Sequence, residues 1–355
     1  MRKVIGYIIL GICILIYFVS SSQKLTFKLN LLKEQSNSFW GSDKHRYGDL
    51  FGLTYLSSFK RRSTGSFKLP DCSVQKKIDL YEICDSYMFL FFNSAKYYCG
   101  VEKLTQIKTN EQETLAAKLD TSKINVLLLE FSERNVRVLL EDSDYMKNII
   151  SENYSNNSKS KLKEKIKDAY HFLFNKDINT NLEYHICDYA VFTPIKEFKA
   201  NLNYKLFNTI DKDVKLSKSG NQLFYAPTID SSKISSSFQH VTDSEIKVIV
   251  ASLNKIYLKA KKLGFNKIYL SIIPNPVSIL EPDYNKLKYN YLITRIQNSQ
   301  ELLVPYVDAF SLLNAAKKDA YSPSDTHWTW HGAYIWLDKF NYDLANAIKE
   351  KIKTN

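Results

Sequence analysis

Runs of apolar residues alternate with amphipathic stretches along this chain, and the pattern predicts strands that are followed by helices. Two runs are apolar at nearly every position, at 124–131 (INVLLLEF) and 267–273 (KIYLSII). Continuous apolar runs of this length are typical of parallel strands buried on both faces of a sheet. An alternating segment at 77–83 predicts another strand, and an apolar run of helical length follows at 87–98.

The second half of the chain carries the clearest helix signals. Thr242 precedes an amphipathic stretch and Glu245 follows three residues later, which is the signature of a capping box. Gly264 ends the pattern, so we expect this helix to run to about Leu263. Three more elements are expected beyond it: a helix at about 285–300, a strand at 303–307 and a helix at 332–348. This alternation predicts a three-layer, flavodoxin-like α/β fold, a parallel sheet flanked by helices.

The N-terminal apolar segment is of a different kind. Arg2 and Lys3 precede an uncharged run from Val4 to Val19, which Ser20 to Ser22 can extend. A helix of about 20 apolar residues spans a bilayer. The preceding positive charge places the N-terminus in the cytoplasm and the chain after about residue 24 outside. The poor cleavage site favours a transmembrane signal anchor, and a cleaved signal peptide is the alternative.

We therefore expect a single-pass protein of the inner (cytoplasmic) membrane whose main domain is periplasmic or extracellular. Residues 1–23 would be the anchor or signal peptide, and residues 24–75 an irregular lead-in. Residues 76–355 would form the α/β domain, with an insertion or cap at about 182–240. A Lys-rich stretch within 151–181 has helical spacing and predicts a solvated amphipathic helix.

Composition and charge narrow the function classes. Of the 355 residues, 45% are hydrophobic and 14% aromatic, so the chain can bury a large core. The net charge of +12 is spread along the chain and not gathered in a patch, so we expect no nucleic-acid partner. Outside the cytoplasm one disulfide is expected among the five cysteines, between Cys72 and either Cys99 or Cys187.

The tetrad Asp325-Thr326-His327-Trp328 is the most informative motif for chemistry. A carboxylate two residues before a histidine can hold one imidazole nitrogen, which leaves the other to take a proton from a nucleophile. Ser86 is the candidate nucleophile, because it lies where the strand at 77–83 passes into a helix, next to free N–H groups. A serine at that position is often only a helix cap. Its pairing with Asp325 and His327 favours catalysis.

A metal site is the competing interpretation of the same region. His327 and His331 are four residues apart and could share a helix face. The residues between them supply no glutamate base, no third ligand is evident, and Gly332 interrupts a helix there. We therefore expect no metal and no cofactor.

These motifs resemble those of the SGNH (GDSL-type) hydrolase superfamily, and more narrowly its membrane-associated branch of alginate and polysaccharide O-acetyltransferase-like proteins. That branch carries Asp-x-His-Trp with a Gly soon after it, which here are Asp325 to Trp328 and Gly332. The superfamily's first block, Gly-Asp-Ser, is Cys84-Asp85-Ser86 here, so Cys84 departs from it. The resemblance covers about residues 45–350.

The resemblance implies a role for each site residue. Ser86 would be the nucleophile, His327 the base and Asp325 its partner. The superfamily's oxyanion hole combines the backbone N–H of the serine with a glycine and an asparagine from later loops. Gly100 is the nearest glycine candidate. Four further residues are expected at the oxyanion or substrate site: Asn135, Arg134, Trp328 and Asn275.

The function that the resemblance implies is an extracytoplasmic O-acetyltransferase. It would act on a cell-surface or secreted polysaccharide through a Ser86 acyl-enzyme, with a multispanning membrane acyltransferase as the acyl donor. A carbohydrate esterase of the same fold is one alternative, because water and a sugar hydroxyl are chemically similar acceptors. A non-catalytic glycan-binding or assembly protein is the other, favoured by Cys84 and by the lack of an evident second glycine.

Overall fold

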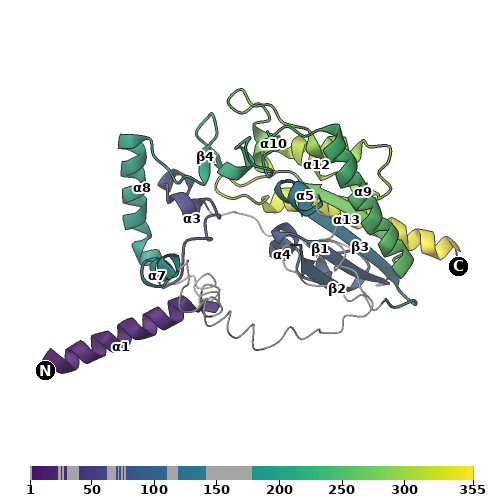
Figure 1. Ribbon diagram of the computed structural model, residues 1–355. Coiled ribbons are helices and arrows are strands. Elements are labelled where there is room, and N and C mark those ends of the chain that lie inside the picture. Colours follow the sequence, from purple (N-terminus) through teal and green to yellow (C-terminus); the bar gives the residue numbers. More distant parts are fainter. Residues whose placement is uncertain are drawn as a thin grey trace. The chain divides into compact units, whose positions relative to one another are not determined.

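The computed structural model describes residues 2–22, 25, 28–29, 40–61, 69–70, 72, 75, 77–109, 119–140 and 178–354. These residues belong to two compact units, each built from two stretches of the chain (Figure 1). Unit 1 draws on Met1–Arg62 and Ser155–Asp211, and unit 2 on Ser63–Tyr154 and Lys212–Asn355. A Lys-rich helix was predicted within 151–181, and residues 151–177 of that stretch lie outside the described residues.

Unit 2 is built around a five-stranded parallel sheet with the strand order β2-β1-β3-β6-β7. Its strands are β1 (Ile78–Cys84), β2 (Val101–Lys108), β3 (Ile124–Ser132), β6 (Lys267–Ile273) and β7 (Tyr306–Val307). Counted within the sheet, this is the order 2-1-3-4-5 of flavodoxin-like folds. The predicted α/β fold with a parallel sheet is therefore confirmed.

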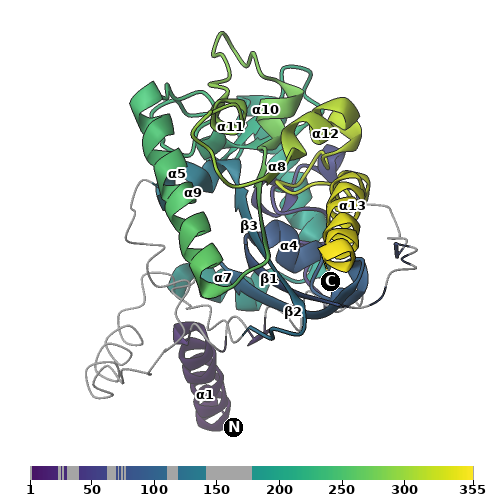
Figure 2. The same cartoon turned by 90° about the vertical axis from the view of Figure 1, so that its right-hand side faces the viewer.

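Helices cover both faces of the sheet, as Figure 2 shows. One face packs against α5 (Glu133–Leu140), α9 (Asp243–Leu263) and α11 (Leu292–Gln297). The other packs against α4 (Ser86–Phe91), α12 (Ala309–Ala316) and α13 (Trp330–Thr354). Because side chains alternate along a strand, β3 gives Leu127 to the first core and Leu128 to the second. This is why the central runs are apolar at nearly every position.

Shorter elements complete unit 2. The strands β4 (Val214–Leu216) and β5 (Leu223–Tyr225) form an antiparallel hairpin. Four short helices lie between the main elements: η2 (Ala95–Tyr97), η5 (Ala226–Thr228), α10 (Pro276–Leu280) and η6 (Lys317–Asp319). A disulfide joins Cys72 to Cys99, which is one of the two predicted pairings, whereas Cys187 is a free thiol.

Of three predicted helices in unit 2, one is confirmed and two are shorter than predicted. The helix α9 has the expected capping box between Thr242 and Glu245, and it ends at Gly264 with a φ of 104°. The helix predicted at 87–98 ends at Phe91 instead: the backbone of Phe92 leaves helical geometry, with φ −128° and ψ 48°, and its buried ring stacks on Trp336 with a centroid distance of 5.8 Å. The helix predicted at 285–300 is limited to α11.

Unit 1 holds α1 (Arg2–Ser21), α3 (Phe51–Thr54), η1 (Ser57–Phe59), α7 (Ile178–Cys187), η4 (Ala190–Phe192) and α8 (Thr193–Phe207). The helix α1 is long and apolar enough to cross a bilayer, as a signal anchor or a signal sequence would be. The helix α7 packs against α1, and Asn181 Nδ2 donates to the carbonyl of Ser20 at 2.8 Å.

Candidate active site

Ser86, His327 and Asp325 form a chain of hydrogen bonds in unit 2, so the structure brings together the three residues that the sequence paired. Ser86 Oγ lies 2.8 Å from His327 Nε2, and His327 Nδ1 lies 2.7 Å from Asp325 Oδ1. Asp325 Oδ1 also accepts from the backbone N–H of His327 at 2.9 Å. In this geometry an imidazole can remove the serine proton while the carboxylate fixes its tautomer.

The position of Ser86 in the fold suits this chemistry. Ser86 is the first residue of α4, and a single residue, Asp85, separates it from the end of β1. In open α/β sheets, ligands bind beyond the carboxyl ends of the strands. Asp85 is the helix cap, and its Oδ1 accepts from the backbone N–H of Ser86 at 2.7 Å. An oxyanion bound by that N–H would share the donor with this carboxylate.

The end of β3 and the start of α5 hold the turn that carries Ser86. Ser132 Oγ and Asn135 Nδ2 both donate to Asp85 Oδ2 at 2.6 Å. Burial acts to raise the pKa of Asp85. The hydrogen bonds from Ser132 and the N–H of Ser86, with the positive charge of Arg134, outweigh it and lower that pKa below its ordinary value. Asp85 is therefore ionised at neutral pH and acts as a fixed anchor for the turn.

Two fully buried carboxyl groups lie in the sheet beside this turn, Glu82 on β1 and Glu130 on β3, and Glu130 bonds to the turn itself. Glu130 Oε2 accepts from the backbone N–H of Asp85 at 2.6 Å. Burial, with the nearby charge of Asp85, raises the pKa of Glu130 well above its ordinary value. Burial also raises the pKa of Glu82 to about 7, against hydrogen bonds from Tyr98 and Gln106. A protonated Glu130 avoids a second buried charge beside Asp85.

The loop that carries Asp325 and His327 is held by contacts to its backbone. Tyr87 Oη donates to the carbonyl of Thr326 at 2.7 Å. Gln222 Nε2 donates to the carbonyl of Ser322 at 2.7 Å, and the N–H of Leu223 donates to that of Pro323 at 2.8 Å. The β4–β5 hairpin, which belongs to the stretch predicted as an insertion or cap, therefore supports the loop of the base.

Gly332, part of the motif behind the resemblance, has a steric role. A Cβ atom at this position would lie 2.5 Å from the carbonyl oxygen of Ala320. The loop closes at the same place, where the N–H of Thr329 donates to the Ala320 carbonyl at 2.8 Å. A side chain at position 332 would push the start of α13 away from Ala320 and displace the loop of His327.

Two of the predicted oxyanion or substrate residues lie near the turn that carries Ser86. Asn135 reaches Asp85, as described above, so its amide supports the turn. Arg134 has its guanidinium carbon 5.8 Å from the centroid of the Tyr225 ring, and its charge acts on Asp85. Both residues are only partly buried. Arg134 is thus the better placed of the two to meet a substrate.

The structure places Trp328 and Asn275, two other predicted site residues, inside the protein. Trp328 is only 1% exposed, and its ring packs edge-on against Tyr87, Phe91 and Phe92, so it belongs to the core and does not line a sugar site. Asn275 is 3% exposed, and its Nδ2 donates to Ser237 Oγ at 2.9 Å. Its side chain is therefore used inside a buried network and is not offered to a substrate.

Gly100 is not positioned to form an oxyanion hole with Ser86. Its carbonyl accepts from the N–H groups of Lys77 and Ile78, at the beginning of β1, whereas Ser86 lies beyond the end of that strand. The length of the strand separates the two by roughly 20 Å. Gly100 has a φ of +73°, and a Cβ there would lie 2.4 Å from Ile348 Cδ1. The glycine is required by the fold.

The zinc hypothesis for His327 and His331 finds no support in this geometry. Both ring nitrogens of His327 take part in the hydrogen-bonded chain, one with Ser86 and one with Asp325. His331 lies on α13 with an exposed side chain. His327 would have to leave Ser86 or Asp325 in order to bind an ion.

Sequence reasoning missed the supporting shell of the site. Glu130 was visible as the one charged residue in the apolar run INVLLLEF, and a charge at such a position usually has a partner. Comparisons with protein-family models, with curated proteins and with solved structures each gave no match for this chain.

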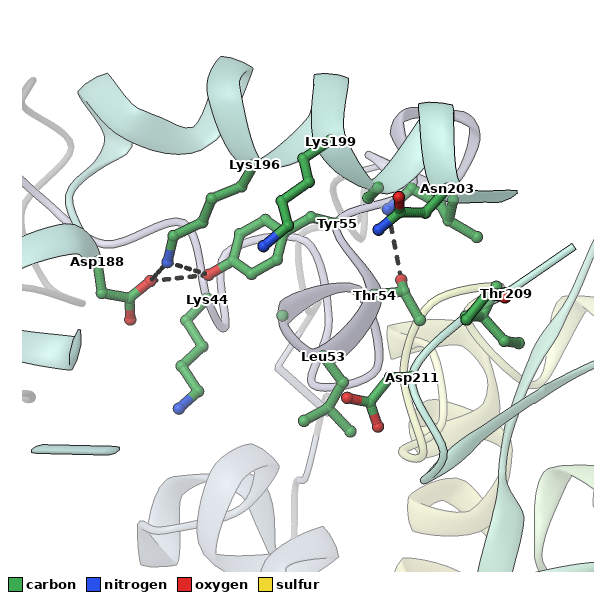
Figure 3. Close-up of a pocket in the computed structure, with 14 residues that line it drawn as sticks. Lys44, Leu53, Thr54, Tyr55, Asp188, Lys196, Lys199, Asn203, Thr209 and Asp211 are labelled. Atoms are coloured by element: carbon green, nitrogen blue, oxygen red, sulfur yellow. Dashed lines mark hydrogen bonds and ion pairs between the residues drawn. The ribbon is translucent and has the colours of Figure 1, made fainter. Parts of the chain in front are cut away.

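Unit 1 has a pocket of its own, of about 580 Å³ (Figure 3). Lys196, Lys199 and Asn203 reach it from α8, and Tyr55 and Asp188 also line it. Asp188 Oδ1 accepts from Tyr55 Oη at 2.7 Å and lies 3.0 Å from Lys196 Nζ. The pocket shows that α8 turns a polar side inward.

Proposed function

We propose that this chain is a serine acyl-transfer enzyme that works outside the cytoplasm. The observation that carries the proposal is the continuous hydrogen-bonded chain from Ser86 Oγ through His327 to Asp325. A serine hydroxyl is a weak nucleophile until an adjacent base takes its proton, and a third group must orient that base. All three parts are present at the carboxyl end of a parallel sheet.

The reaction would proceed in two halves. Ser86 Oγ attacks the acyl carbonyl of the donor and passes its proton to His327 Nε2, while Asp325 stabilises the imidazolium. His327 then returns the proton to the leaving group, which departs and leaves an ester on Ser86. In the second half an acceptor hydroxyl attacks that ester and gives its proton to His327. The collapse of the second intermediate transfers the acyl group and restores the Ser86 hydroxyl.

We propose a hydroxyl group of a cell-surface or secreted polysaccharide as the acceptor and acetyl as the acyl group. This choice is supported by the resemblance of the Asp325 tetrad to the polysaccharide O-acetyltransferase-like branch. It is supported also by α1, which as a retained signal anchor would hold the enzyme in the membrane. A multispanning membrane acyltransferase would then supply the acyl group. An esterase would use the same site with water as the acceptor.

The non-catalytic alternative loses one of its two supports. Cys84 stands where the superfamily has glycine, yet its side chain is fully buried and belongs to the core on the α4 and α13 side of the sheet. Burial raises the pKa of its thiol well above the ordinary value, so it stays protonated. The cysteine that stands in place of glycine at position 84 is therefore buried in the core, and Ser86 Oγ still lies within hydrogen-bond distance of His327.

The test uses the purified full chain in detergent with p-nitrophenyl acetate as the donor and acetyl-free oligosaccharides as acceptors. The proposal predicts p-nitrophenol release that depends on Ser86, and acetylated oligosaccharide detected by mass spectrometry. Free acetate with every acceptor would identify an esterase. Release that is equal in wild type and Ser86→Ala would refute the enzyme proposal altogether.

A further inference from the structure

The helix α8 carries a stripe of exposed apolar side chains, which we name the α8 stripe: Ile195, Phe198, Leu202 and Leu206. Their exposed fractions are 66%, 70%, 44% and 64%. The spacing of three and four residues places all four on one side of the helix. A surface helix of a soluble protein normally turns such a stripe toward the core.

The inward side of α8 is the polar one. Lys196 and Asn203 point into the pocket of unit 1, where Lys196 pairs with Asp188 (Figure 3). The orientation of α8 is thus fixed by polar contacts on its inner side. The α8 stripe faces away from the body of unit 1, in the reverse of the usual arrangement. Contiguous exposed apolar surface of this kind marks an interaction site.

The connection to α1 indicates what the α8 stripe contacts. If α1 crosses a bilayer, its last residues, Ser20 and Ser21, lie at the membrane surface, and both are buried by the protein. The helix α7 packs there, through the bond from Asn181 to the Ser20 carbonyl. Only the five residues 188–192 separate α7 from α8. Fully extended, they reach about 17 Å, so α8 begins close to the membrane surface.

The charged residues beside the α8 stripe suit the same surface. At 100° per residue, Lys205 falls on one flank of the stripe and Lys199, at the edge of the unit 1 pocket, on the other, and both are exposed. Interfacial helices combine an apolar face with flanking lysines, whose charged ends reach the lipid phosphates while their stems follow the apolar surface. A protein partner would not require a cation on each flank.

We propose that α8 lies along the surface of the bilayer that α1 crosses, with the α8 stripe inserted among lipid acyl chains. This placement rests on α1 being kept as an anchor, and it does not depend on the chemistry of Ser86. It would tie unit 1 to the membrane at a second point, parallel to the surface.

The test places the photoreactive residue p-benzoyl-phenylalanine at position 198 or 206 of the full chain. The protein is reconstituted in vesicles of phosphatidylethanolamine and phosphatidylglycerol, irradiated, and mapped by peptide mass spectrometry. Leu258 on α9 of unit 2 is the matched control, since it is 56% exposed and equally apolar. The mass of the whole chain, measured from cells, shows whether α1 is retained.

The proposal expects phospholipid adducts at positions 198 and 206 and several-fold fewer at position 258. Equal adduct yields at all three positions would overturn it, as would a chain from cells that lacks α1. In membranes from intact cells, an adduct of position 198 with a protein and none with lipid would also overturn it, because the α8 stripe would then be a protein interface.

Discussion

The two halves of the Ser86 site are held in place by different means. The turn that carries Ser86 takes its support from side chains of β3 and α5: Glu130, Ser132 and Asn135 all bond to Asp85. The loop of His327 takes its support from bonds to its main chain, which Tyr87, Gln222 and Leu223 donate. The first half depends on the protonation of buried carboxyl groups, and the second does not.

The two halves are therefore sensitive to different changes. Buried carboxyl groups make the turn that carries Ser86 sensitive to pH, because their pKa values differ between the folded and unfolded chain. Backbone bonds make the base loop sensitive to the loss of single contacts. The Tyr87 hydroxyl joins the halves, since Tyr87 follows Ser86 on α4 and reaches Thr326 on the loop.

The largest effect is expected from the base itself. We predict that His327→Ala lowers kcat/KM for an activated acetyl ester by about 10²- to 10⁴-fold, the usual contribution of a positioned base. Ester hydrolysis by the purified variants measures it. His331→Ala is the matched control, because this exposed histidine lies four residues away on α13. Equal losses in the two variants would mean that His327 has no special role.

A smaller loss is expected when the partner of the base is changed. In Asp325→Asn an amide replaces the carboxylate that accepts from both the ring and the backbone of His327. The amide can present N–H to the ring and stabilise the wrong tautomer, so we predict a fall in kcat of at least about 10²-fold, with KM little changed. An unchanged kcat would remove Asp325 from the mechanism.

The pH dependence of folding tests the buried acid Glu82, which lies in the sheet on the strand that leads to Ser86. The folded pKa of Glu82 is raised from 4.5 to about 7, so the folded chain keeps a proton that the unfolded chain releases. Its contribution to stability is therefore present below about pH 4.5 and is lost as pH rises toward 7. The shift corresponds to about 3 kcal/mol. We predict that Glu82→Gln flattens the fall in unfolding free energy across this range in urea titrations.

Glu102→Gln is the control for Glu82→Gln. Glu102 lies on the edge strand β2, with its side chain 49% exposed beside Lys123. Its replacement should leave the slope of unfolding free energy against pH close to that of the wild type between pH 4.5 and 7. A Glu82→Gln variant with the same slope as this control would contradict the raised pKa of Glu82 in the folded chain.

The smallest effect is expected at the contact that joins the halves. Tyr87→Phe removes the hydrogen bond to Thr326, so we predict a loss of about 1 kcal/mol in unfolding free energy. Because the loop of the base is then freer, kcat should fall as well. Ser252→Ala removes a similar buried hydroxyl bond, at 2.9 Å to the Leu140 carbonyl, and should lower stability alone. Equal kcat values in the two variants would mean that Tyr87 does not position the loop.

The elements that could be predicted from the sequence were those whose apolar pattern or capping residues indicate the structure. The strands β3 and β6 are continuous apolar runs, and α9 carries both of its caps. The strand β2 was not predicted, because it is the edge of the sheet and several of its side chains remain exposed. An edge strand shows neither a continuous apolar run nor a strict alternation.

The residues of the candidate site also divide into those that the sequence predicts and those that it does not. Ser86, Asp325 and His327 could be grouped from the sequence because a serine, a histidine and a carboxylate together can form a nucleophile, its base and the partner of that base. The supporting shell depends on the register of the sheet, which places Glu82 of β1 beside Gln106 of the unpredicted β2. Trp328 was expected at the substrate because an indole suits a sugar, yet the aromatic rings of α4 enclose it. Packing decides such cases, and the pattern of a single sequence does not contain it.

Covalent trapping of Ser86 tests the central claim most directly. The purified full chain is treated with an activated acetyl ester, quenched in acid and measured as intact protein and as peptides. The account predicts an added acetyl group on the peptide of Ser86, present in the control variant Ser94→Ala and absent in Ser86→Ala. An acetyl group on any other residue, or none with any activated donor, would contradict the account.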